Sequence, residues 1–215
     1  MTATELIAPT DDSLRLSPLA ALLTDWEIEA EAARASYESG TPRGPITNLP
    51  HLDRHLGGFL CPGLHVVHGA PGTGKTALAL QIAAECGAPA LFVSCEMRPL
   101  ELMRRVTARV TQTYLGRLKT GELPAAVSLD LARQAAASAP RLVLADATHG
   151  YAKPERILDA AEGTRGKAPA LLIVMDSVHY GLTAARLTPP STKSSTRGSC
   201  SCAPWPTAST APCSP

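Results

Sequence analysis

The sequence has few aromatic residues, no excess of one charge and no long apolar run. Phe, Trp and Tyr make up 4% of its 215 residues, so we do not expect stacking of single-stranded bases to be its main binding mode. With 20 basic and 19 acidic residues the net charge is +1, which excludes a global positive field for nucleic acid and leaves a local patch open. The longest apolar runs, such as residues 168–175, are far shorter than the roughly 20 residues of a membrane helix.

Two further absences indicate a cytoplasmic setting. The N-terminal stretch MTATELIAPTDD contains acids but no basic residue, unlike a secretory signal. The six cysteines form no Cys-x-x-Cys pair, so we expect neither disulfides nor structural zinc. The chain is therefore expected to work in a reducing cytoplasm and away from the membrane, with a 45% hydrophobic content that suffices for one core.

Residues 1–44 are expected to form a loose arm and a linker helix. The helix is predicted over residues 24–39, with Thr24 or Asp25 as N-cap and Gly40 after its end. Its apolar residues can share one stripe: Trp26, Ile28, Ala32, Ala33 and Tyr37. Two interpretations remain open, because periodicity does not choose a partner. The helix packs on its own domain, or it docks on a neighbouring subunit.

Alternating apolar and amphipathic segments predict a core domain over residues 45–188. Four short apolar segments are predicted strands: residues 64–68, 90–94, 142–145 and 170–175. Four amphipathic segments are predicted helices: residues 75–86, 99–113, 125–138 and 154–164. Buried strands separated by helices are typical of an α/β fold, here a mostly parallel sheet with helices on both faces.

Residues 69–76 carry the strongest signal, the phosphate-binding pattern GAPGTGKT between a predicted strand and a predicted helix. The predicted nucleotide-binding residues are Gly69, Ala70, Pro71, Gly72, Thr73, Gly74, Lys75 and Thr76. The glycines let the backbone curl so that successive N–H groups surround an anion, and the following helix adds the positive end of its dipole. The alternative is a glycine-rich turn with an exposed lysine.

The last two residues of this pattern predict the ligand, ATP with Mg²⁺. Lys75 places a compact positive charge beside the β- and γ-phosphates, where it also has a catalytic role. Thr76 offers its hydroxyl to Mg²⁺. This pattern indicates nucleotide binding but does not identify the reaction that follows.

Two acids at strand ends suggest the reaction. Asp176 ends the apolar segment LLIVMD, and from the carboxyl edge of a parallel strand it can hold a water on Mg²⁺. Glu96 follows the strand of residues 90–94, from where it can orient or deprotonate a water facing the γ-phosphate. The alternatives are a solvated acid at the strand end for Asp176 and an acid of a first helical turn for Glu96.

Five segments together resemble the RecA-like ATPase core of the DnaB-type replicative helicases and their plasmid-encoded RepA-like relatives. They are TNLPHLDRHLGG, GAPGTGKTALALQIA, FVSCEMRPLELMRRV, RLKTGEL and LLIVMDSVHYGL, and they span residues 47–182. The resemblance implies an ATP-driven, Mg²⁺-dependent DNA helicase motor that binds DNA and assembles as a homo-oligomer, a hexamer in the family. It also implies the roles given above for Lys75, Thr76, Glu96 and Asp176.

His179 stands where the family usually has Gln, three residues after Asp176. The resemblance makes it a candidate sensor of the γ-phosphate, and a local hydrogen bond is the equal alternative. In the family the sheet continues beyond this strand, with loops that line the DNA channel and an arginine that acts on a neighbour's ATP. This sequence has a different tail there, so we expect a core that is incomplete at its C-terminal side, with impaired turnover.

The tail over residues 189–215 differs from the rest of the chain. Residues 191–215 contain no Leu, Ile, Val, Met, Phe or acid, but seven Ser, four Thr, four Pro and three Cys, which predicts disorder. A second hypothesis is a shifted reading frame. Permitted codons read one nucleotide earlier give EYEVVNEGLVQLRALADRLDCPVLA, an amphipathic helix followed by a strand, and the encoding DNA would decide between the two.

Three functions compete at this point. The first is a helicase-type ATPase motor, favoured by the resemblance. The second is a non-motor RecA-like module, such as a loader, a recombination accessory or a regulatory switch, favoured by the near-neutral charge. The third is a small-molecule phosphotransferase, which should carry an arginine-rich lid that the sequence does not show.

Overall fold

The computed structural model describes residues 16–149 and 153–177, so His179 and the tail lie outside the described residues. A 3₁₀-helix η2 (Leu19–Leu22) leads into the first helix. The helices are α1 (Leu23–Ser39), α2 (Pro50–His55), α3 (Lys75–Glu85), α4 (Pro99–Val110), α5 (Leu115–Thr120), α6 (Ala125–Ser138) and α7 (Pro154–Arg165). The strands are β1 (Ala90–Ser94), β2 (Leu142–Asp146) and β3 (Leu172–Asp176).

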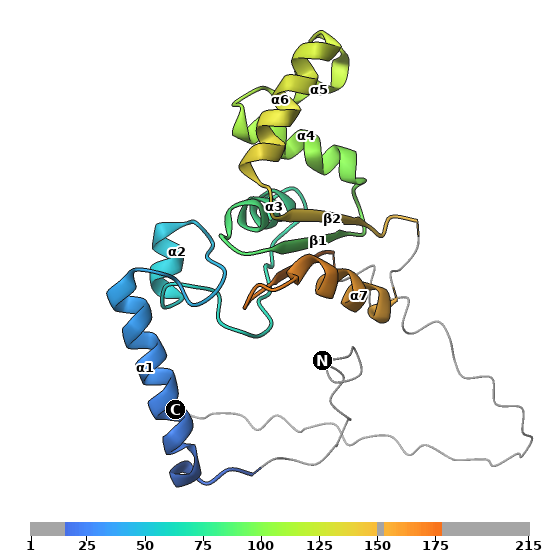
Figure 1. The fold of residues 1–215 in the computed structure, drawn as a ribbon. Coiled ribbons are helices and arrows are strands. Elements are labelled where there is room, and N and C mark those ends of the chain that lie inside the picture. The colour runs from blue at the N-terminus through green and yellow to red at the C-terminus, as the bar shows by residue number, and fades with distance from the viewer. Residues whose placement is uncertain (1–15, 150–152, 178–215) are drawn as a thin grey trace, which may run out of the picture.

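The three strands form one parallel sheet in the order β2-β1-β3. All five residues of β1 are buried, because a strand flanked on both sides and covered on both faces has no side exposed to water. In Figure 1, α3, α4 and α6 lie on one side of the sheet and α7 lies on the other. The sequence therefore predicted the fold class correctly, an α/β fold with a parallel sheet between helices.

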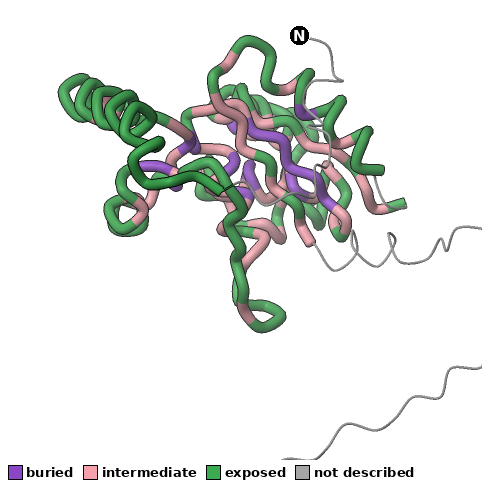
Figure 2. Tube along the Cα trace, turned by 90° about the horizontal axis from the view of Figure 1, so that it is seen from below, coloured by how far each residue is buried: buried purple, intermediate pink, exposed green. Residues whose placement is uncertain are grey.

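Each face of β1 contributes to its own hydrophobic cluster. Ala90 and Phe92 pack with residues of α3, α4 and α6: Leu80, Ala83, Leu102, Val106 and Ala135. Leu91 and Val93 pack on the opposite face against Ala161 of α7. Side chains alternate across a strand, so the apolar run of β1 supplies both clusters. Figure 2 shows these buried segments at the centre of the molecule.

The predicted strand over residues 64–68 is wrong in this structure. The segment has no assigned secondary structure, and Leu64 and Val66 are 89% and 76% exposed. Figure 1 accordingly draws the chain between α2 and α3 without an arrow. Apolar composition favours a strand only where a neighbouring strand supplies hydrogen bonds, and within residues 16–149 and 153–177 no strand pairs with this segment.

The predicted helix over residues 24–39 is confirmed as α1, but two details differ. Its N-cap is Leu22, because the 3₁₀ turn already holds the chain in a helical conformation there. Its apolar side chains are exposed, with Trp26 at 76% and Ile28 at 61%, so the interpretation that α1 packs on its own domain is wrong. Gly40 ends the helix as expected, in the left-handed conformation.

The sheet is covered less completely than the sequence suggested. Ile173 and Met175 of β3 and Val143 of β2 are partly exposed on the α7 face. Their register partners on β1 are Leu91 and Val93, which α7 does cover. A single helix covers the central strand and leaves its neighbours partly open.

Candidate nucleotide-binding site

The loop over residues 69–74 has the backbone form that the glycine pattern predicted. Gly72 and Gly74 have φ values of 79° and 90°, in the left-handed region that a residue with a Cβ rarely adopts. Thr73 closes the turn, since its hydroxyl and its N–H both donate to the Ala70 carbonyl, at 2.8 and 3.4 Å. The two glycines thus let the chain reverse direction just before α3.

Lys75 folds back over this loop. Its Nζ donates to the carbonyl oxygens of Gly69 and Ala70, both at 2.9 Å. The half-buried ammonium group is therefore held at the mouth of the loop rather than extended into solvent. This is the position from which a lysine can neutralise bound phosphate.

The N-terminus of α3 provides further donors. Gly74 is its N-cap and has no side chain to accept a hydrogen bond, so the N–H groups of the first turn lack a side-chain cap. Thr76 lies half-buried in that turn. Uncapped N–H groups at the positive end of a helix dipole favour an anion.

The carboxyl ends of the three strands are level with one another. Ser94 of β1 is in register with Asp146 on one side and Asp176 on the other. Parallel sheets bind ligands at this edge. The sequence carried a signal for Asp146 that we did not use, because LVLAD repeats the pattern of LLIVMD.

Asp146 is already engaged by its own loop. The Thr148 hydroxyl donates to its Oδ1 at 2.6 Å, and the Thr148 N–H donates to the same oxygen at 2.9 Å. These donors, with the hydroxyl as the larger cause, hold the pKa of Asp146 below its ordinary value. Asp146 is therefore charged at neutral pH, and its Oδ1 is occupied by donors of its own loop.

The Asp176 carboxylate, unlike that of Asp146, has a buried oxygen without a hydrogen-bond donor in the described structure. Its Oδ2 is buried and has no hydrogen-bond partner among the described residues, which is costly for a carboxylate oxygen. Its backbone carbonyl accepts the Cys95 N–H at 2.7 Å, and the peptide bond to Ser177 is cis. Burial raises the pKa of the Cys95 thiol, and the nearby Asp176 charge raises it further.

Glu96 lies in the turn after β1 and is exposed. It follows Cys95, so the structure places Glu96 and Asp176 at neighbouring strand ends. Within the described part of the chain, no hydrogen bond or ion pair joins either acid to Lys75 or Thr76. The structure therefore brings Lys75 to the loop and Asp176 beside Cys95, but does not join the two groups.

A lock formed by Thr47 and Asp53 fixes the segment before the loop. Asp53 Oδ1 accepts both the N–H and the hydroxyl of the buried Thr47, each at 2.7 Å. The adjacent Ile46 N–H donates to the Cys86 carbonyl at 3.0 Å, which ties the segment to the end of α3. The family resemblance drew attention to these residues without giving them a role.

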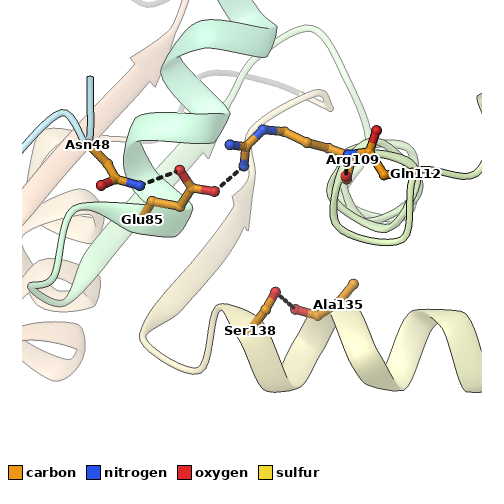
Figure 3. Close-up of polar contacts among 6 residues, drawn as sticks. All are labelled: Asn48, Glu85, Arg109, Gln112, Ala135 and Ser138. Atoms are coloured by element: carbon orange, nitrogen blue, oxygen red, sulfur yellow. Dashed lines mark hydrogen bonds and ion pairs between the residues drawn. The ribbon is translucent and has the colours of Figure 1, made fainter. Parts of the chain in front are cut away.

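A second polar contact joins the same segment to α3 and α4 (Figure 3). Glu85 accepts from Asn48 at 2.9 Å and forms a hydrogen-bonded ion pair with Arg109. The Arg109 guanidinium, the largest cause, holds the pKa of Glu85 below its usual value. Figure 3 also shows Gln112 donating to the Arg109 carbonyl and Ser138 donating to the Ala135 carbonyl.

Neither a cluster of metal-binding side chains nor a membrane-spanning helix occurs among the described residues. They contain no group of three or more His, Cys, Asp and Glu side chains that could hold a metal. None of their helices is both long enough and apolar enough to cross a bilayer.

The comparison with known families is decisive for the ancestry of the chain. Residues 44–180, more than half of the 215, match the model of the DnaB-like helicase C-terminal domain. The chain belongs to this family. The match contains the Thr47–Asp53 lock, the glycine loop, Glu96 and Asp176, so it confirms the resemblance drawn from the five sequence segments. No curated protein matches the chain.

Proposed function

We propose that this member of the DnaB-like helicase family binds ATP with Mg²⁺ at residues 69–76 and hydrolyses it as part of a DNA-dependent motor. The observation that carries the proposal is one family match that covers the loop and both acids. The glycine backbone, the folded-back Lys75 and the uncapped start of α3 support phosphate binding there.

The donor set fits Mg²⁺. Asp176 Oδ2 is buried without a hydrogen bond in the described residues, so a cation or its bound water would satisfy it. Thr76 would supply a hydroxyl oxygen, and both are oxygen ligands of the kind that Mg²⁺ prefers. When bound, the ion would neutralise charge on the phosphates.

Glu96 would orient and deprotonate the attacking water. Its exposed carboxylate is free to take part in this step, since no hydrogen bond or ion pair occupies it in the described structure. Its neighbour Cys95 is hydrogen-bonded to Asp176 at the carboxyl end of β3, and this is the edge at which parallel sheets bind ligands, which supports the proposal. Asp176, in contrast, would hold the cation.

Helix α1 would supply a contact between copies of the chain. It exposes Leu23, Trp26, Ile28 and Tyr37, and it carries more acids than bases. A groove of about 490 Å³ between α3 and α4 has an apolar floor and is flanked by Arg105 and Arg109. Arg109 is already paired with Glu85 and Arg105 with Glu101, so it is the apolar lining of the groove that would receive the exposed side chains of α1. Such a contact fits the homo-oligomer expected from the resemblance.

Calorimetry with Mg–ATP and a phosphate-release assay test the proposal together. Lys75→Ala should lose nucleotide binding, because the loop would lose its charge-assisted contact with phosphate. Glu96→Gln should keep binding but release phosphate at least about 100-fold more slowly, the effect of losing a general base. Glu162→Gln, a change at an exposed acid of α7, is the matched control.

Single-stranded DNA in the same assay separates the candidate functions. Phosphate release that single-stranded DNA accelerates supports the motor. ATP binding without any such acceleration supports the non-motor module. We expect slow release from the chain alone, because Glu96 is exposed and the segment that carries the loop is outside the sheet. Absence of Mg-dependent ATP binding in folded protein would refute the proposal.

A further inference from the structure

The turn that carries Glu96 is tied to both neighbouring strand ends. On one side, the Ser94 carbonyl accepts the Ala147 N–H at 2.8 Å, just past the end of β2. On the other side, the Cys95 N–H donates to the Asp176 carbonyl at 2.7 Å, at the end of β3. Within the part of the chain that the structure describes, no hydrogen bond holds Glu96 itself. The position of Glu96 therefore depends on the residues before and after it.

The far end of this turn is held by one side chain, that of Ser94. Its Oγ accepts the Met97 N–H at 3.1 Å. Ser94 is completely buried, and it lies on the same face of β1 as Phe92, because side chains alternate along a strand. Met97 packs against the hydrophobic cluster on that face. The backbone and the side chain of the residue that follows Glu96 are thus both fixed.

Ser94 can act on Glu96 only through the backbone. Its side chain has no exposed surface, so it does not touch a bound nucleotide. The N–H groups of Cys95 and Met97, on either side of Glu96, are both hydrogen-bonded, which restricts the peptide units between them. This restriction matters for a general base, because a misplacement of about 1 Å can slow a reaction by about 100-fold.

We propose that Ser94 is a positioning residue for Glu96. The inference rests on the proposed ATP hydrolysis with Glu96 as general base. Ser94 Oγ holds the Met97 N–H, and the turn fixed in this way directs the Glu96 carboxylate to the water that attacks the γ-phosphate. The Ser94 hydroxyl takes no part in making or breaking bonds.

Hydrogen exchange of the unaltered chain tests the hydrogen bond itself. After correction for intrinsic rates, the Met97 amide should exchange at least about tenfold more slowly than the Glu96 amide, because only the Met97 amide is hydrogen-bonded among the described residues. Equal exchange of the two amides overturns the inference, whether or not the chain binds ATP.

Phosphate release in a single turnover, with protein in excess over Mg–ATP, tests the effect on the reaction. Ser94→Ala removes the acceptor of the Met97 N–H, so release should slow by about tenfold. Its affinity for a fluorescent ATP analogue should change by less than about twofold, because the glycine loop is untouched. The matched control is Thr107→Val, which removes another buried hydroxyl, one that donates to the Met103 carbonyl within α4. This control should release phosphate at the unaltered rate.

A double-mutant cycle with Glu96→Gln distinguishes positioning from a general loss of structure. Once the carboxylate is lost, its placement no longer matters. Adding Ser94→Ala to Glu96→Gln should therefore change the rate of release by less than about twofold. A further slowing as large as in the unaltered background overturns the inference, because Ser94 would then act independently of Glu96.

The outcomes separate this inference from the proposed function. If Glu96→Gln slows release and Ser94→Ala does not, the inference is overturned and the role of Glu96 stands. If Ser94→Ala and Thr107→Val slow release equally, the inference is also overturned, because any buried hydroxyl would then have the same effect. If the unaltered chain releases no phosphate, or Glu96→Gln releases it at the unaltered rate, the proposed hydrolysis by Glu96 fails and the inference fails with it.

Discussion

At the residue scale, Lys75 and Asp176 differ in how their polar atoms are satisfied. The Lys75 ammonium is satisfied by two carbonyls that a phosphate could replace as partners. Asp176 Oδ2 is buried without a donor in the described structure. Asp146, at the same level of the sheet, is satisfied by Thr148, so similar sequence patterns end in carboxylates with different local donors.

Glu85 gives a pH-dependent prediction at the same scale. Arg109 holds its folded-state pKa below the usual 4.5, so the folded chain binds fewer protons here than the unfolded chain. The stabilisation is complete above pH 4.5 and is lost as the pH falls through the lowered folded pKa. Glu85→Gln should therefore lower the free energy of unfolding at neutral pH by up to about 1 kcal/mol, since the pair is partly exposed.

Urea unfolding of this variant at neutral pH and in acid measures the effect. The difference from the unaltered chain should shrink in acid, where Glu85 is protonated in both states. Glu122→Gln is the control, because Glu122 pairs with Arg117 on a more exposed surface. A difference that is the same at both pH values would contradict the assigned role of Glu85.

At the element scale, the Thr47–Asp53 lock holds the segment before α2 against α2 itself. One carboxylate oxygen accepts two donors from the buried Thr47. Asp53→Ala leaves both donors unsatisfied, so it should lower the free energy of unfolding by about 1–3 kcal/mol. Chemical denaturation measures the loss.

The matched control for this variant is Asp159→Ala. Asp159 is an exposed acid of α7 whose ion pair with Arg156 is long, at 4.0 Å, so its loss should stay within about 0.5 kcal/mol. Equal effects of the two substitutions would show that the lock contributes nothing beyond a surface charge.

At the scale of the whole molecule, α1 exposes apolar side chains that a self-contained domain would bury. In Figure 1, α1 projects away from the sheet, and none of its residues is buried. Trp26→Ser should shift the protein toward the monomer, because a large apolar contact at an interface is lost. Sedimentation velocity over a concentration series measures the shift.

Val127→Ser is the control for the oligomer. Val127 is an exposed apolar residue of α6, so its loss changes surface hydrophobicity without changing α1. Val127→Ser should sediment like the unaltered chain. If the unaltered chain, Trp26→Ser and Val127→Ser all sediment alike, α1 is excluded as the contact between copies.

The sequence by itself located the longer helices and the three strands of the sheet, and it predicted phosphate binding at the loop. Periodicity, glycine positions and apolar runs are local properties, and they located α3, α6 and β1 to within one residue. They missed the short helices α2 and α5, where the apolar periodicity extends over too few residues to be recognised.

Only the tertiary structure decided which apolar segment became a strand and which faces were covered. Residues 64–68 and β1 look alike in sequence, but β1 has neighbours on both sides and the other segment has none among the described strands. Helix α1 is a second example, because its apolar stripe is not buried by any other described element. A strand obtains its hydrogen bonds, and a helix its buried face, from residues far away in the chain, so local sequence cannot settle either.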